Sequence, residues 1–531
     1  MFHDALSRSQ QVIRSVVVVG LLSCLAAQPS LGQGITGRID GMVSDSQGGV
    51  LPGASVTIVN ENTGLTVARV TDGQGIFTVT NLPVGIYTIT AELQGFRRQQ
   101  KTGFDLTADG RLTADFALGV GELSESVDVT AVAGEIVNRT SGEVSRTIDT
   151  QQIKDLAFNG RNYMELASLI PGSVATTFDP LELATSLATT GQSINGARAN
   201  TNNLTIDGTS NVDSGSNGGQ VNNVSLSFID QVKIQTSNFS AELGRSSGAA
   251  INVVTRSGTN RYRGTARFDI RDEAFDEANY FAPRDANGAR IKAPLEFRNF
   301  EGALGGPIVR NRLFFFVGQQ YRTINRFTNP SRHTLPTSAE LNGDFSVRLR
   351  GADGIVGTAD DGVLRDAATG QPFPGNVIPQ NRISPNGRAF ANIYRALQGR
   401  AAQWSDTPTV NNATFQEFNP FKHREDIVRL DWQATGTQRF YGRYIHDQYT
   451  LIDPLGTFSG TTLPTVPTDR SRPGTSYQIG HTYVASTNLI NEVKIGASWN
   501  GQRIRPVGDL WLRDTHGITF QEVFDTPGFV A

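Results

Sequence analysis

The stretch Ile194–Asn260 decides the fold of this chain; it reads INGARANTNNLTIDGTSNVDSGSNGGQVNNVSLSFIDQVKIQTSNFSAELGRSSGAAINVVTRSGTN. Asn, Ser, Thr and Gly surround three short segments rich in β-branched residues, at 204–207, 229–234 and 250–255. In the second segment, Val232 and Ile234 alternate with polar neighbours, which is the period-two pattern of a half-buried strand. The composition also fits a polar linker, but a linker has no use for regularly spaced Val and Ile pairs. The stretch therefore predicts strands of a folded domain.

Four motifs of this stretch resemble the second half of the plug domain of TonB-dependent outer-membrane receptors. They are NGAR at 195–198, LTIDG at 204–208, FSAELGRSSG at 239–248 and INVVT at 251–255. Their order and spacing are similar, more narrowly, to the Oar-like branch, whose members carry an extra N-terminal β-domain. The resemblance implies an α+β plug that fills the lumen of a β-barrel, and we place this plug at residues 121–257.

Composition limits both the fold and the function. The 531 residues exceed one ordinary domain, and 56 Gly and 29 Phe with three Met favour strands and turns over helix bundles. The formal net charge of −3 argues against a nucleic-acid partner. A single cysteine, Cys24, excludes an internal disulfide. We expect a mainly β protein of about three domains with no cofactor.

Residues 1–32 have the pattern of a secretory signal peptide. Two arginines precede a short apolar core at residues 16–27, and small residues follow up to Gly32. This pattern predicts cleavage after Gly32, with Ala27 as the competing site. Residues 21–24 have the outline of a lipoprotein box, although a cysteine in an apolar core is more often only a small apolar residue. No later stretch approaches the roughly 20 apolar residues of a membrane helix, so a membrane-spanning form has to be a barrel.

Residues 33–120 carry turn clusters about ten residues apart with alternating strands between them, as in a β-sandwich. The motifs TDGQGIF at 71–77 and LPVGIY at 82–87 resemble the carboxypeptidase regulatory-like, transthyretin-type domain. The resemblance implies no peptidase activity, since such domains lack the catalytic groups. No histidine lies between His3 and His333, which excludes a histidine-based zinc site in this domain.

A segment that follows the sandwich is similar to the TonB box, the extended segment with which these receptors pair as a strand with the periplasmic protein TonB. It consists of Glu125, Ser126, Val127, Asp128, Val129, Thr130 and Ala131. Its two valines alternate with polar residues, and such a segment with a free edge suits strand addition. The alternative is that it forms the last strand of the sandwich or the first strand of the plug. Further on, residues 150–172 predict two short helical segments, the second of which ends at Pro171-Gly172, and they also resemble the Oar-like plug.

From residue 258 to 531 the chain shows longer segments with one apolar and one charged face. Ala266, Phe268 and Ile270 alternate with charged residues, and segments 428–433 and 492–499 repeat the pattern. Together with the signal peptide and the aromatics near strand ends, this indicates a transmembrane β-barrel in contact with outer-membrane lipid. We count only about eight strand candidates, whereas plugged transporters have 22. We therefore expect a partial barrel from an N-terminal fragment of a longer receptor, with a long extracellular loop at about 325–424.

Two sets of candidate site residues follow. In the long loop, Asp353, Asp360 and Asp361 cluster around glycines and offer oxygen ligands of the kind that suits Ca²⁺. Their spacing departs from the EF-hand and the closing glutamate is missing, so a solvated Asp-Gly turn is the alternative. In the plug, the candidates for ligand contact are Arg198, Asn203, Asp207 and the glycine-rich 214–219 segment, with structural roles as the alternative.

The predicted fold is mainly β, with an N-terminal sandwich, an α+β plug and the first strands of a transmembrane antiparallel barrel. The predicted function is that of a TonB-dependent receptor in the outer membrane of a Gram-negative-type bacterium. The resemblance implies energised uptake of a glycan, peptide, ferric chelate or cobalamin, without selecting among them. The alternative is an adhesion or surface-interaction protein without active transport. An enzyme is disfavoured, because the chain has no His-Glu-x-x-His and no phosphate-binding Gly-Lys-Ser/Thr motif.

Overall fold

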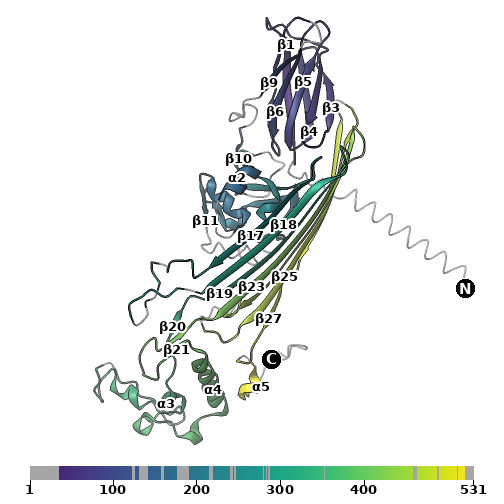
Figure 1. Cartoon of the computed structure of the whole chain (residues 1–531). Helices are drawn as coiled ribbons and strands as arrows, with labels where there is room; N and C mark the ends of the chain where they lie inside the picture. Colours follow the sequence, from purple (N-terminus) through teal and green to yellow (C-terminus); the bar gives the residue numbers. More distant parts are fainter. Residues whose placement is uncertain are drawn as a thin grey trace, which may run out of the picture.

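The computed structural model is mainly β, as predicted, and consists of a sandwich, a smaller α+β domain within residues 142–255, which we call the plug after the prediction, and a long curved sheet (Figure 1). It describes residues 35–121, 126–130, 142–156, 161–175, 191–213, 219–239, 243, 247–278, 280–282, 284, 287–292, 294–351, 353–457, 463–486, 489–510 and 512–520. The predicted signal peptide lies outside these residues. Within them, no helix combines the length and the apolar character needed to cross a bilayer.

The sandwich packs two sheets around one apolar core. One sheet has the order β3 (Thr66–Val70), β2 (Ser55–Asn60), β5 (Gly85–Glu92), β6 (Arg98–Leu106) and β9 (Ser126–Thr130). The other has the order β4 (Ile76–Pro83), β1 (Thr36–Asp45) and β7 (Arg111–Thr113), with β8 (Phe116–Leu118) also on β1. Alternate residues such as Val56, Ile58, Phe77 and Val79 point inward and are buried, which is the pattern that makes each strand form.

The plug contains a five-stranded sheet that unites the three predicted strands. Its order is β10 (Val144–Ile148), β15 (Ile229–Ser237), β16 (Ala250–Thr255), β13 (Asn203–Ile206) and β14 (Thr209–Ser210). The remaining plug elements are α2 (Thr150–Asp155), the 3-10 helices η1 (Tyr163–Leu169), η2 (Ala199–Thr201) and η3 (Leu226–Phe228), and the pair β11 (Ser173–Ala175) and β12 (Gln192–Ile194). The Asp149 carboxylate caps α2 by accepting from the backbone N–H of Gln152 at 2.8 Å, as helix starts require.

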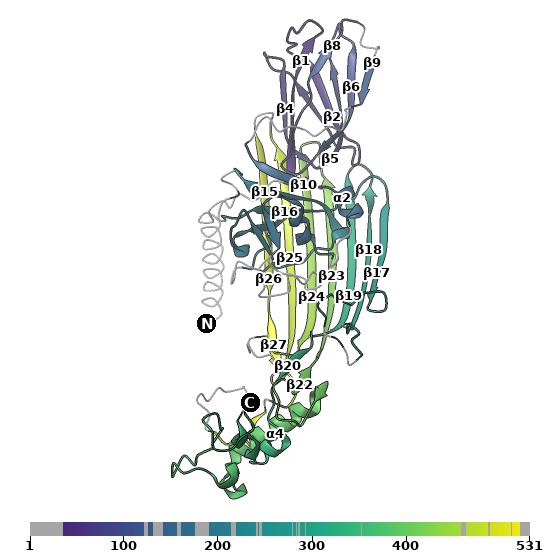
Figure 2. The same ribbon diagram turned by 90° about the vertical axis from the view of Figure 1, so that its left-hand side faces the viewer.

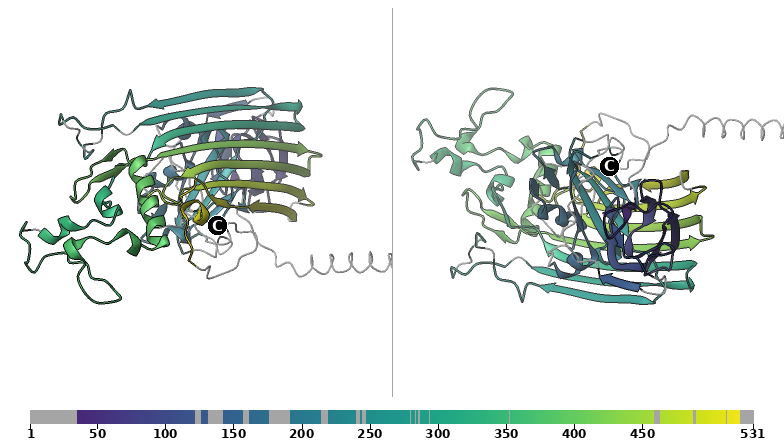
Figure 3. Two further views of the ribbon diagram at one scale, coloured as in Figure 1. Left: turned by 90° about the horizontal axis from the view of Figure 1, so that it is seen from below. Right: turned by 90° about the horizontal axis from the view of Figure 1, so that it is seen from above.

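An eight-stranded antiparallel sheet curves around the plug, which lies on its concave face (Figures 1 and 3). In order, its strands are β17 (Arg263–Asp272), β18 (Leu295–Val309), β19 (Leu313–Phe327), β23 (Phe418–Gln433), β24 (Gln438–Asp453), β25 (Thr468–Val484) and β26 (Ile490–Asn500), with β27 (Arg503–Pro506) on β25. Residues such as Phe268, Ile270 and Ile495 are exposed on the convex face. Within the described residues the sheet is open, since β17 and β26 do not pair with each other.

The long loop expected at 325–424 is more ordered than the sequence suggested. Residues 331–417 form a lobe at the end of the sheet opposite the sandwich (Figures 1 and 2). Its elements are β20 (Ser331–His333), α3 (Ser338–Leu341), η5 (Ser346–Arg350), η6 (Pro374–Asn376), η7 (Gln380–Arg382), α4 (Pro385–Arg400), β21 (Gln403–Trp404) and β22 (Ala413–Phe415), and α5 (Arg513–His516) lies nearby. The lobe has its own core, in which Leu335, Leu397 and Phe415 pack with Leu510.

Candidate functional site at the plug and the sheet wall

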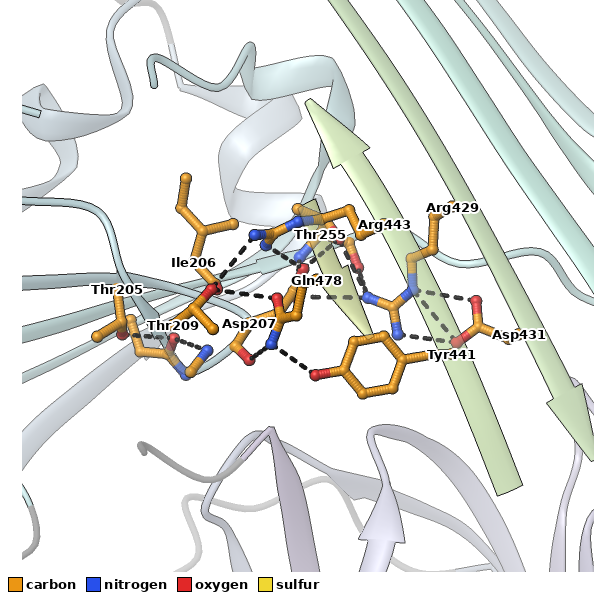
Figure 4. A network of polar contacts seen from close by, with 12 residues as sticks. Thr205, Ile206, Asp207, Thr209, Thr255, Arg429, Asp431, Tyr441, Arg443 and Gln478 are labelled. Atoms are coloured by element: carbon orange, nitrogen blue, oxygen red, sulfur yellow. Dashed lines mark hydrogen bonds and ion pairs between the residues drawn. The ribbon is translucent and has the colours of Figure 1, made fainter. Parts of the chain in front are cut away.

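A buried carboxylate of the plug meets two arginines of the sheet. Asp207, in the turn after β13, is fully buried and has a φ of 48°. Its Oδ2 accepts from Arg443 Nη1 at 2.7 Å, and its Oδ1 lies 3.4 Å from Arg429 Nη1. The backbone N–H and the hydroxyl of Thr255 donate to the same carboxylate at 2.9 and 2.7 Å. Figure 4 shows these groups converging from the plug and from the sheet.

The sheet side of this contact is a single row of side chains. Arg429 on β23, Arg443 on β24 and Gln478 on β25 stand directly opposite one another in the strand register. Gln478 Nε2 donates to the backbone carbonyl of Asp207 at 2.9 Å. Because residues directly opposite in antiparallel strands share a face, all three reach the plug. We call Asp207, Thr255, Arg429, Arg443 and Gln478 the Asp207 network.

The electrostatics of the Asp207 network favour the ionised carboxylate. Burial by itself would raise the pKa of Asp207, but Arg443 and Arg429, with the hydrogen bonds from Thr255, hold that pKa below its usual value. Arg429 is also held in place by Asp431, whose Oδ1 lies 2.9 Å from Arg429 Nη2. The arrangement is a charged anchor between the plug and the concave face of the curved sheet, which we call the wall.

A second set of contacts joins the plug to the neighbouring strands. Arg161 donates twice to Glu301 of β18, from Nε and Nη2, both at 3.2 Å. Glu425 of β23 accepts from the backbone N–H of Ser225 at 2.9 Å, and Asp447 of β24 accepts from that of Asn223 at 2.7 Å. These wall carboxylates are buried, at 0% exposure for Glu425 and 1% for Glu301. The plug is therefore fixed to the wall mainly by charged and polar groups.

Of the three plug residues predicted from sequence to contact a ligand, only Asp207 takes part in the contact with Arg429 and Arg443 described above. Arg198 is exposed at the start of η2, and Asn203 begins β13, where it pairs in register with Ala250. Most of the predicted 214–219 segment lies outside the described residues. The role of Arg198 and Asn203 in ligand contact stays a prediction.

The TonB-box-like segment forms an edge strand of the sandwich. Residues 126–130 are β9, which pairs in parallel with β6 from Ser126 opposite Arg98 to Thr130 opposite Thr102. Glu125 and Ala131 lie outside the described residues. This placement corresponds to one of the two readings of the sequence, and one edge of β9 faces away from the sheet. TonB pairing stays a prediction.

The three aspartates proposed for Ca²⁺ each support a turn of the lobe. Asp353 Oδ1 accepts from Ile355 N at 2.8 Å, Asp360 Oδ1 from Thr358 Oγ1 at 2.7 Å and Asp361 Oδ2 from Gly357 N at 2.6 Å. In the described part of the chain, no group of three or more His, Cys, Asp or Glu side chains is arranged to hold a metal. The geometry favours the solvated-turn alternative.

We expect the lobe to bind no Ca²⁺, because the carboxylate oxygens already accept hydrogen bonds of their own turns. The measurement is isothermal titration calorimetry of the whole chain with CaCl₂, compared with the Asp360→Asn variant. A saturable heat in the unchanged chain that disappears in the variant would contradict this expectation.

Known proteins resemble the chain in two regions. Residues 254–529, more than half of the chain, match the outer membrane beta barrel domain. The chain belongs to this family. Residues 38–119 match the carboxypeptidase regulatory-like domain. In this outer membrane beta barrel domain protein, the curved sheet is thus the family's own region and the sandwich is an added domain.

This outer membrane beta barrel domain protein is similar in sequence to a known transporter. The TonB-dependent transporter Oar of Myxococcus xanthus is 27% identical over 371 residues, which cover 66% of this chain and 32% of Oar. The chain thus spans about a third of the length of that relative. The predicted likeness to Oar is confirmed.

Two solved structures are also similar. The outer membrane transporter YddB from Escherichia coli has a TM-score of 0.38 at 12% identity, covering 67% of this chain and 38% of YddB. The siderophore receptor PirA from Acinetobacter baumannii has a TM-score of 0.34 at 10% identity, covering 68% of this chain and 44% of PirA.

Sequence reasoning missed most of the wall residues of the site. The alternation in β23 placed Arg429 and Asp431 on a polar face, but Arg443, Glu301 and Gln478 carried no signal of their own. One sequence feature could have pointed to these wall residues. Charged residues on one face of a long strand are expected to face the lumen, where they meet a polar plug.

Proposed function

We propose that this protein acts as a TonB-dependent outer-membrane receptor, in which the plug closes a barrel and is displaced during energised uptake. The observation that carries the proposal is the Asp207 network, in which a plug turn is anchored by Arg429 and Arg443 to the concave face of the sheet. A soluble β-sandwich or an adhesin has no need for a separate polar domain anchored inside a curved sheet.

The contact between the plug and the wall is mainly polar, and this suits a plug that has to be displaced and to return. The apolar core of the plug takes few partners from the wall, chiefly Phe316, Ile427 and Ile445, while ion pairs and hydrogen bonds supply the rest. A buried ion pair fixes geometry but adds little net stability compared with an apolar contact. A plug held in this way is well placed yet can leave its seat once a competing force breaks a small number of bonds.

A cavity at the lobe end of the sheet is a candidate ligand region in this proposal. It has a volume of about 780 Å³ and is lined by aromatic, acidic and basic side chains, among them Phe281, Phe327, Glu273, Arg271 and Lys292. Mixed lining of this kind fits peptide or glycan ligands as well as chelates, so the class of ligand stays open. Arg198 and Asn203 remain secondary candidates for ligand contact.

The experiment that tests the proposal removes the TonB-box-like segment. Deleting residues 125–131 is expected to abolish energised accumulation while the protein still reaches the outer membrane, because TonB pairing needs a strand to add to. Labelled peptides, glycans, ferric chelates and cobalamin are each offered to cells with and without a protonophore.

The matched control places prolines in the other edge strand of the same sheet, with Val67→Pro and Arg69→Pro in β3. This change disturbs the sandwich similarly but leaves the segment in place, so it should retain uptake. Uptake that persists in the deletion, or binding of a ligand that never requires energy, would favour the surface-interaction alternative.

A further inference from the structure

The polar face of strand β15 is covered by the sandwich. Val232 and Ile234 point into the plug core, as their alternation predicts. The residues between and beside them, Gln231, Lys233 and Gln235, are also buried, with exposures of 3 to 5%. A buried polar strand face marks an interface, and the cover here is the turn at residues 107–110, which follows β6, together with Glu143 of the plug.

This 107–110 turn grips the plug at two points. The backbone N–H of Ala108 donates to Gln231 Oε1 at 2.9 Å, and both residues are buried. Lys233 Nζ donates to Asp109 Oδ2 at 3.0 Å and to the Asp109 carbonyl at 3.3 Å. Asp109 has a φ of 53°, a conformation that Asp and Asn tolerate better than most residues.

The same sandwich also bonds to the barrel wall. Asn260, just before β17, donates its backbone N–H to the carbonyl of Asn62 at 2.9 Å and is tied by its side chain to Asn311 in the β18–β19 turn at 2.7 Å. Arg439 of β24 donates to the carbonyl of Asn81. Because these loops and the 107–110 turn share one sandwich core, the sandwich bridges plug and wall. The plug therefore cannot move against the wall unless one set of bonds breaks.

On the plug side, the 107–110 turn can leave without stranding a buried charge. Lys233 has a second carboxylate within the plug, Glu143, whose Oε1 lies 3.0 Å from Nζ. When Asp109 withdraws, the buried ammonium keeps this partner, so no charge is left unpaired. Asp109 is 48% exposed in its side chain and returns to water easily. A cavity of about 770 Å³ lies beside this contact, so the area over which the sandwich touches the plug is small.

We propose that the N-terminal sandwich is a latch on the plug: its 107–110 turn holds β15 while Asn62 and Asn81 hold the wall, and the plug is displaced only after this turn lets go. The inference rests on the proposed function in one respect, because it assumes that the plug moves. It assigns a role to the carboxypeptidase regulatory-like domain that its resemblance to that family does not supply.

The test measures hydrogen exchange of the purified full chain in detergent. Asp109→Asn keeps the turn conformation but removes the charge, and it is expected to speed exchange about fivefold at 203–210, near Asp207 and outside the latch contact. The control Glu92→Gln removes a surface ion pair with Arg98 in the same sandwich and should leave plug exchange unchanged. In Asp109→Cys/Lys233→Cys, a short reducible thiol cross-linker should slow exchange at 203–210, and reductant should reverse the effect.

Exchange that changes only at 229–237 in Asp109→Asn, or cross-linking that leaves 203–210 unchanged, overturns the latch. None of these measurements needs a ligand. A failure to detect TonB-dependent uptake by the unchanged protein would therefore count against the receptor function alone, while the exchange data decide on the latch.

Discussion

Asp207→Ala is expected to destabilise the seated plug by about 3–5 kcal/mol, because it leaves a buried cation without its carboxylate. Arg443 is the residue most affected: its side chain is 1% exposed, Nη1 donates to Asp207, and Nε has no hydrogen-bond partner among the described residues. Arg429 suffers less since Asp431 still holds it. The measurement is denaturant-dependent hydrogen exchange at 203–210 in the purified chain.

Three variants define the origin of this loss. Asp155→Asn alters an exposed carboxylate on α2 of the same plug and should stay within about 0.5 kcal/mol of the unchanged chain. Asp207→Asn keeps the shape of the side chain but removes its charge, so its loss of stability should lie between those of Asp155→Asn and Asp207→Ala. Adding Arg443→Met to Asp207→Ala removes the orphaned cation and should recover part of the loss. If Asp207→Ala destabilises residues 203–210 no more than Asp155→Asn does, Asp207 does not anchor the plug.

The same carboxylate has a defined pH signature. Its pKa in the folded protein lies below the unfolded value of about 3.9. A depressed pKa means that the stabilisation is fully present above the unfolded pKa and is lost as the pH falls through the folded pKa. The difference between the unchanged chain and Asp207→Asn should therefore be constant from about pH 5 to pH 8 and shrink only below about pH 4.

The strands were predictable where apolar and polar residues alternate in the sequence. β15 and the long strands β17, β23 and β26 carry this period-two alternation, which is a local property of the chain. The partners of these strands were not predictable in the same way. Asp207 and Arg429 are 222 positions apart, and no local pattern states which of several wall charges will face a given plug turn.

The lobe shows why composition misled the reading of residues 325–424. Gly, Pro, Asn and Asp are frequent there and indicate loops, yet Ser384 caps a sixteen-residue helix, α4, with Pro385 at its first position. The core of the lobe contains Leu335, Leu397 and Phe415, and these residues are too far apart in the sequence to form a periodic pattern. A small core built from single apolar residues on separate turns is invisible to a windowed pattern.

Gly474→Ala is expected to displace the plug segment Gln220–Val224 from the wall. Gly474, on β25, lies against this segment, and a methyl group there would overlap the carbonyl oxygen of Val221 and lie 3.1 Å from Asn222 Nδ2. The segment cannot simply step back, because Asp447 holds the N–H of Asn223 and Arg472 donates to the Val221 carbonyl at 3.3 Å. Overpacking of about 1–3 kcal/mol adds to the loss of a buried hydrogen bond of about 1–3 kcal/mol.

The identity of the neighbouring atom ranks the glycines of the wall and gives this prediction its control. At Gly474 the obstacle is a backbone carbonyl that itself accepts a hydrogen bond from Arg472; at Gly318 it is the buried ring of Phe228, whose Cε1 would lie 2.5 Å from the new methyl and whose displacement breaks no hydrogen bond. At Gly436 a methyl meets nothing within 4 Å. The rate of hydrogen exchange at 219–224 and the loss of thermal stability should therefore be largest in Gly474→Ala, smaller in Gly318→Ala and smallest in Gly436→Ala. Equal behaviour of Gly474→Ala and Gly436→Ala would mean that the plug does not rest on β25, because close backbone approach is the only reason for a side chain to be intolerable there.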